Sequence, residues 1–165
     1  MGRKRTKGKD RRKGVDPGGR AGAGGGGPRR RQYAALPLAT GEDGRRLVML
    51  VTSRETRRWV IPKGNPEKGL APHALAAKEA YEEAGLVGVV GPEPVGAFRY
   101  AKRLGGRKVV PVQVEVFPLA VERELADWPE RGQRERRWFA PGEAALLVEE
   151  GGLAEILLAL AAAEG

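Results

Sequence analysis

Residues 78–86 of this 165-residue chain read Lys78-Glu79-Ala80-Tyr81-Glu82-Glu83-Ala84-Gly85-Leu86. They end a predicted helix that runs from Pro72 to Ala84, because proline suits a first turn, alanine fills the body and Gly85 is a typical C-terminal stop. At about 100° per residue, the glutamates at positions 79, 82 and 83 share an arc of roughly 100°. The pattern therefore predicts three carboxylates on one face of a short helix.

These three carboxylates repel one another. Like charges at this spacing cost a helix roughly 0.2–0.5 kcal/mol per pair, and acids near the C-terminal end also oppose the helix dipole. A hard divalent cation offsets both costs, because it takes several oxygens from one rigid element. The chain has no cysteine and a single histidine, His73, so a metal must use oxygen ligands or that histidine. We therefore expect Mg²⁺ or Mn²⁺ at this cluster.

From Tyr33 onward, short apolar segments alternate with turn residues. Glu115 falls among alternating valines, so we expect it to face away from the core. Strands and helices that mix without regular alternation predict an α+β domain with α/β/α layers. The expected strands cover 33–39, 47–52, 59–61, 87–90, 96–100, 109–117 and 136–139; a loop is expected at 63–70 and further helices at 143–149 and 153–163.

The formal charge of +9 belongs to the N-terminal tail. Residues 1–31 carry 12 Lys/Arg against 2 Asp/Glu, whereas residues 32–165 carry 18 against 19. The tail also contains the glycine run 24–27 and almost nothing apolar, which predicts a disordered basic Gly-rich segment before a folded domain at 32–165. Such a tail is either a dispensable extension or a non-specific contact for RNA or another polyanion.

Apolar segments of this chain are short. None approaches the roughly 18 residues needed to span a bilayer, and none follows the basic N-terminus as a signal peptide requires. We therefore expect a cytoplasmic protein with no membrane partner.

Together with Gly64, the helix resembles the signature of the Nudix hydrolases: Gly, five residues, Glu, seven residues, Arg-Glu, an aliphatic, any residue, Glu-Glu, any residue, Gly, an aliphatic. The chain matches this signature at both glycines and all three glutamates, and departs from it at Leu70, where Glu is expected, and at Lys78, where Arg is expected. The resemblance implies a mixed sheet flanked by helices and a metal-dependent hydrolase of phosphoanhydride bonds. It implies that Glu79, Glu82 and Glu83 are catalytic, that they hold the metal together with the Gly64 carbonyl, and that either Glu82 or Glu83 is the base.

Flanking segments resemble the diphosphoinositol polyphosphate phosphohydrolase branch of that family, which also cleaves diadenosine polyphosphates. The expected substrates are therefore nucleoside-diphosphate-linked or polyphosphorylated compounds of the diphosphoinositol polyphosphate or dinucleoside polyphosphate type. Arg54, Lys63 and Arg134 are expected to bind their phosphates. A basic loop is expected to close over these phosphates; its residues are Arg99, Lys102, Arg103, Arg107 and Lys108. The resembling segments are Ser53-Arg54, 58–64, Asp127-Trp128 and 134–139.

Two further functions are compatible with the sequence. The basic tail suits an enzyme that removes pyrophosphate from RNA 5′ ends. Leu70 and Lys78 suit a catalytically silent Nudix domain that binds a nucleotide or RNA. In an active enzyme, the same two departures are expected to alter positioning and metal affinity, because lysine offers a point charge in place of a planar fork.

Overall fold

A computed structural model describes residues 30–164 of the chain. The predicted disordered tail lies outside the described residues up to position 29. Its last two residues, Arg30 and Arg31, are the first residues of strand β1 (Arg30–Thr40), so the folded domain begins two residues earlier than predicted. No helix within residues 30–164 is long and apolar enough to cross a membrane.

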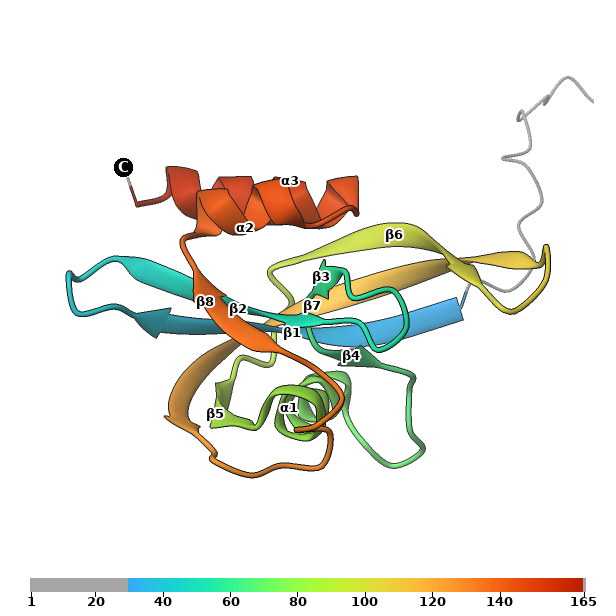
Figure 1. Cartoon of the computed structure of the whole chain (residues 1–165), viewed down its shortest axis with the longest axis horizontal. Coiled ribbons are helices and arrows are strands. Elements are labelled where there is room, and N and C mark those ends of the chain that lie inside the picture. Colours follow the sequence, from blue (N-terminus) through green and yellow to red (C-terminus); the bar gives the residue numbers. More distant parts are fainter. Residues whose placement is uncertain (1–29, 165) are drawn as a thin grey trace, which may run out of the picture.

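Eight strands of the described region form one mixed sheet, which is the middle layer of the domain (Figure 1). The central strand β1 pairs in parallel with β7 and antiparallel with β2 and β4. Strands β3 and β8 pair with β2, and β5 and β6 pair with β7. The bounds are β2 (Arg46–Thr52), β3 (Trp59–Val60), β4 (Lys63–Gly64), β5 (Leu86–Val90), β6 (Gly96–Arg103), β7 (Val109–Glu124) and β8 (Arg136–Phe139).

Helices cover both faces of this sheet. In Figure 1, α1 (Pro72–Ala84) lies below the sheet, and α2 (Pro141–Leu147) and α3 (Gly151–Ala162) lie above it. The predicted α/β/α sandwich with a mixed sheet is confirmed. The predicted helix 72–84 is also confirmed, and Gly85 caps it in the left-handed conformation at φ 64°.

The predicted ends of several strands were wrong. β7 continues past Pro118 to Glu124, because it pairs with β1 on one side and with β5 on the other. The segment predicted as a loop from residue 63 begins with the short strand β4, whose two residues pair with Tyr33 and Ala34 of β1. This pairing places Gly64 in the sheet, against the side chain of Glu79 from α1.

Each face of the sheet has its own apolar core. Val112, Val114 and Val116 of β7 belong to the core under α2 and α3, whereas Phe117 and Leu119 belong to the core under α1. Over residues 110–116 the strand alternates, with valines on the side that α2 and α3 cover and less buried residues on the other. Glu115 alternates with the valines and thus lies on the α1 face, which has a core of its own. Glu115 is half-buried and lies on the face opposite the valines, as the alternation predicted.

Candidate active site

Helix α1 places two of its glutamates against β4. Glu83 is 7% exposed, and its Oε2 accepts a hydrogen bond from the backbone N–H of Lys63 at 3.3 Å. A β-carbon at position 64 would overlap the carboxyl group of Glu79, so only glycine allows this carboxyl to lie against the backbone there. The structure thus brings together Gly64, Glu79 and Glu83, as the signature predicted.

Glu82 does not join this pair. Its Oε1 lies 3.8 Å from Nζ of Lys78, one helical turn earlier, and Glu82 is not among the residues that line the cleft beside α1. No three acidic or histidine side chains within residues 30–164 are grouped closely enough to hold a metal ion. In this conformation Glu82 lies apart from Glu79 and Glu83, and the convergence of all three glutamates on one metal stays a prediction. Glu83 belongs to the buried face of α1 and Glu82 does not, and Lys78 pairs with Glu82 on the more exposed side.

One of the two departures from the signature, Lys78, forms an ion pair with Glu67. Nζ of Lys78 donates to both carboxylate oxygens of Glu67, at 2.7 and 2.9 Å. The hydrogen bond to Glu67 raises the pKa of Lys78 above its usual value. Glu67 lies in the loop between β4 and α1, three residues before Leu70. The loop therefore supplies a carboxylate to Lys78, although position 70, where the signature has Glu, is occupied by Leu.

Burial raises the pKa of both Glu79 and Glu83 to about 7. The neighbouring charge of Glu82 adds to the effect at Glu79. At Glu83 the guanidinium of Arg134 opposes it and the charge of Glu79 adds to it. Both carboxylates are at least partly buried, and the positive charge near them does not offset the effect of burial on their pKa. This set of donors, with the backbone at Gly64, fits a hard divalent cation.

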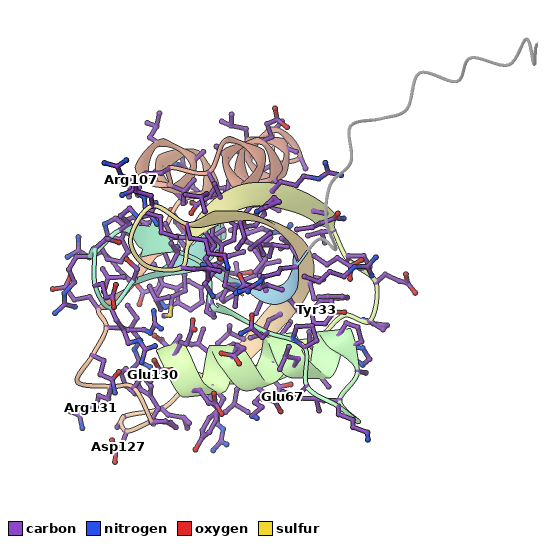
Figure 2. The ribbon with its side chains drawn as sticks, turned by 90° about the vertical axis from the view of Figure 1, so that its right-hand side faces the viewer. Tyr33, Glu67, Arg107, Asp127, Glu130 and Arg131 are labelled. Atoms are coloured by element: carbon purple, nitrogen blue, oxygen red, sulfur yellow. The ribbon has the colours of Figure 1, made fainter. Side chains whose placement is uncertain are left out.

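A further carboxylate near Glu79 and Glu83, which the sequence did not reveal, lies in the same cleft. Glu130 belongs to the segment between β7 and β8, and its charge raises the pKa of both Glu79 and Glu83. Figure 2 shows Glu130 beside one end of α1 and Glu67 farther along the same helix. No other glutamate lies three or four residues from Glu130, so no pattern like that of α1 marks it in the sequence. Its spacing of four residues from Arg134, with which it pairs at 3.2 Å, was the available signal.

Arg134 is occupied by protein acceptors. Its Nη2 donates to Oε1 of Glu83 at 3.4 Å, its Nη1 to the carbonyl of Thr52 at 3.1 Å, and its Nε to Oε1 of Glu130 at 3.2 Å. The side chain is only 10% exposed. Arg134 was expected to bind phosphate, but this geometry uses its guanidinium to hold Glu83.

The cleft has a volume of about 1490 Å³ and extends from α1 toward the β6–β7 hairpin and the start of α3. All three predicted substrate-binding residues, Arg54, Lys63 and Arg134, line it, as do Lys102 and Arg103 of the predicted basic loop. Nζ of Lys63 lies 5.4 Å from the centre of the Tyr100 ring. The carboxylates of Glu79 and Glu83 thus lie in a wide cleft whose walls also carry arginine and lysine.

A NUDIX domain model matches residues 29–160 of the chain. The chain belongs to the Nudix hydrolase family. This result agrees with the positions of Gly64, Glu79 and Glu83, since it covers the whole cleft and the helix that supplies the two glutamates.

Relatives of this Nudix chain are named as hydrolases. "Nudix hydrolase 12, mitochondrial" of Arabidopsis thaliana is 37% identical over 105 residues, which cover 59% of this chain and 49% of the relative. Diphosphoinositol polyphosphate phosphohydrolase 3-alpha of Mus musculus is 33% identical over 95 residues, which cover 56% of this chain and 54% of the relative. The chain therefore spans about half the length of these curated relatives.

A solved structure of an Ap4A hydrolase from C. elegans, in a binary complex, has the same fold as this Nudix chain. The match has a TM-score of 0.61 and covers 82% of this chain and 97% of the other, at 15% sequence identity. At this identity the likeness concerns the fold alone.

Proposed function

We propose that this Nudix chain hydrolyses a phosphoanhydride bond in a polyphosphorylated small molecule, with Mg²⁺ or Mn²⁺ held by Glu79, Glu83 and the backbone carbonyl of Gly64. The observation that carries this proposal is the pair of helix carboxylates, both with a pKa raised to about 7, set against a glycine inside a wide cleft. When bound, the cation supplies positive charge beside the phosphate oxygens and lowers the pKa of a water molecule.

Glu83 is our candidate for the base. Its two oxygens are oriented by the N–H of Lys63 and by Arg134, and a carboxylate whose pKa is near the working pH is suited to take a proton from water. The oxygen of that water attacks phosphorus, the anhydride P–O bond breaks, and the proton passes to a carboxylate oxygen of Glu83. We assign Glu82 a lesser part, because it must first leave Lys78 to reach the cleft.

Arg54 and Lys63 are our candidates for phosphate binding. Arg54 is largely exposed at the mouth of the cleft, and it interacts with Glu130 across 3.9 Å, too far for a hydrogen bond. Lys63 lies next to Gly64, so a phosphate beside the two glutamates is within reach of its ammonium group. Arg134 in this proposal orients Glu83, because three of its nitrogens already have protein acceptors.

The charge of the cleft favours a dinucleoside polyphosphate over a diphosphoinositol polyphosphate. Among the described residues that line it, six are Lys or Arg and seven are Glu. A diphosphoinositol polyphosphate carries phosphates on all sides of its ring and needs an excess of cations around it. A dinucleoside polyphosphate concentrates its charge in a linear chain between two neutral nucleosides. The mouse relative is named for the first class and the C. elegans structure for the second.

One buried atom supports a nucleoside in the part of the cleft beside the start of α3. Glu150, at the start of α3, lines the cleft, and its Oε2 is buried with no hydrogen-bond partner among the described residues. An unpaired buried carboxylate oxygen costs free energy that a donor restores. Amino groups of a base and hydroxyls of a ribose are such donors, whereas a phosphate repels this carboxylate.

The test is phosphate release from diadenosine tetraphosphate and from a diphosphoinositol polyphosphate, with Mg²⁺, with Mn²⁺ and with EDTA. The parent is compared with Glu79→Gln and with Glu115→Gln, a matched acid on the same face of the sheet but outside the cleft. We expect metal-dependent release that favours diadenosine tetraphosphate, is lost in Glu79→Gln and is kept in Glu115→Gln. Equal rates in the parent and in Glu79→Gln would sink the proposal.

A further inference from the structure

The C-terminal end of α1 is held by a single segment, residues 125–136. The last carbonyls of a helix have no partner within the helix and must find donors elsewhere. Four consecutive carbonyls here accept hydrogen bonds from this one segment. The pairs are Glu130 N to Glu82 O at 3.0 Å, Trp128 Nε1 to Glu83 O at 3.2 Å, Arg136 Nη1 to Ala84 O at 2.8 Å and Leu125 N to Gly85 O at 2.8 Å.

Two of these donors are side chains that pack on each other. The guanidinium carbon of Arg136 lies 3.9 Å from the centre of the Trp128 ring, and Nη2 of Arg136 donates to the carbonyl of Leu125 at 2.8 Å. A β-carbon at Gly85 would come within 2.6 Å of Cδ2 of Trp128 and 2.9 Å of Nη1 of Arg136. Gly85 is therefore required both for its left-handed backbone and for the approach of this pair, which we call the Trp128–Arg136 clamp.

The clamp also balances charge. α1 has no basic residue in its last turn, yet Glu79, Glu82 and Glu83 crowd the end where the helix dipole is negative. The guanidinium of Arg136 at the Ala84 carbonyl places a positive charge at that end. It thus offsets part of the helix-dipole cost within the protein itself, beside the divalent cation expected from the sequence.

We propose that Trp128 and Arg136 are positioning residues for Glu83. Neither lines the cleft, so they act through the backbone of α1 and set where the Glu83 carboxylate lies relative to Gly64. Arg134, two residues before Arg136 on the same segment, holds that carboxylate from its other side. One segment therefore fixes both the backbone and the side chain of Glu83. The inference rests on the proposed function, in which Glu83 holds the metal and takes the proton.

The test measures Mn²⁺ binding, from the electron paramagnetic resonance signal of free Mn²⁺, together with kcat and KM for diadenosine tetraphosphate. Arg136→Met should bind Mn²⁺ about tenfold more weakly and lower kcat while KM stays unchanged. Arg136→Lys keeps the charge without the planar fork and should recover part of the affinity. Trp128→Phe keeps the ring but removes the Nε1 donor, and should give a smaller loss.

Arg137→Met is the matched control, because Arg137 is the next residue of β8 and lies over the rings of Trp59 and Phe139, away from α1. It should behave like the parent. Mn²⁺ affinity unchanged in a folded Arg136→Met protein, or lowered as much in Arg137→Met, overturns the inference. If Arg136→Met does not fold, parent-like Mn²⁺ affinity in both Arg136→Lys and Trp128→Phe overturns it.

The two proposals fail in different ways. A parent that binds Mn²⁺ but releases no phosphate contradicts the proposed function, while the Mn²⁺ affinities of the variants still decide whether the clamp positions Glu83. A parent that does not bind Mn²⁺ at all overturns both.

Discussion

Nζ of Lys78 lies 2.7 and 2.9 Å from the two carboxylate oxygens of Glu67 and 3.8 Å from Oε1 of Glu82. The shorter contacts tie α1 to the loop that follows β4, and the longer one draws Glu82 away from the cleft. Lys78 therefore divides its charge between a structural partner and one of the signature glutamates.

Removing Lys78 should disturb the metal site without unfolding the protein. In Lys78→Met the loop loses its tie to α1, and we expect more Mg²⁺ to be needed for half-maximal activity. Lys78→Arg, which offers a planar fork to the same carboxylate, should be at least as active as the parent. Lys68→Met, an exposed lysine in the same loop, is the control. Identical Mg²⁺ dependence in Lys78→Met and in the parent would show that the ion pair has no part in the site.

Truncating Glu150 should affect only substrates that carry a nucleoside. Glu150→Ala removes the buried unpaired acceptor, so KM for diadenosine tetraphosphate should rise about tenfold or more, roughly the effect of one lost hydrogen bond to a charged group. Inorganic tetraphosphate has no donor for Glu150, and its hydrolysis should be unchanged. An equal change for both substrates would refute the placement of the nucleoside beside α3.

Metal binding should depend on pH in a predictable direction. The pKa of both Glu79 and Glu83 is raised to about 7 from a usual value of 4.5. The folded protein therefore binds more protons than the unfolded chain in this window, so the free energy of unfolding that these groups contribute falls as pH rises through it. Mg²⁺ binds the deprotonated carboxylates, so the increase in Tm on adding Mg²⁺ should be larger at about pH 8 than at about pH 5.5.

Thermal unfolding with Mg²⁺ or EDTA across this range measures the effect. In Glu83→Gln one of the two titrating groups is gone, so the change of Tm with pH in EDTA should be smaller. A Tm in EDTA that depends on pH equally in the parent and in Glu83→Gln would contradict the assignment.

Deletion of the basic tail distinguishes the proposed function from the removal of pyrophosphate from RNA 5′ ends. The tail accounts for the net positive charge of the chain, so its deletion should matter only for a long polyanion. We expect a protein without residues 2–29 to hydrolyse diadenosine tetraphosphate at the rate of the parent. A large fall in turnover of 5′-triphosphorylated RNA, with small-molecule turnover already negligible in the parent, would instead favour the RNA activity.

Local patterns predicted the parts of the site that depend on one segment. Pro72 and Gly85 mark the ends of α1 through their own backbone preferences, and helical spacing with the signature glycine identified Glu79, Glu83 and Gly64. The same spacing grouped Glu82 with Glu79 and Glu83, because spacing alone does not say which side of the helix is buried.

The parts that depend on distant segments were not predictable in this way. Glu130, the role of Arg134 and the Trp128–Arg136 clamp all come from residues 125–136, whose approach to α1 is set by tertiary packing. β7 likewise extends past Pro118 only because two other strands pair with it there. A periodic pattern describes one element, whereas these contacts join elements far apart in the chain.

The most direct test of the central claim compares the three glutamates one at a time. Mn²⁺ binding and turnover of diadenosine tetraphosphate are measured in Glu79→Gln, Glu82→Gln and Glu83→Gln. Because Glu79 and Glu83 line the cleft beside Gly64 and Glu82 pairs with Lys78, the first and third variants should lose about 100-fold or more in kcat and bind Mn²⁺ weakly, and Glu82→Gln should lose less. Full activity and Mn²⁺ affinity in Glu83→Gln, or a loss confined to Glu82→Gln, would contradict the account.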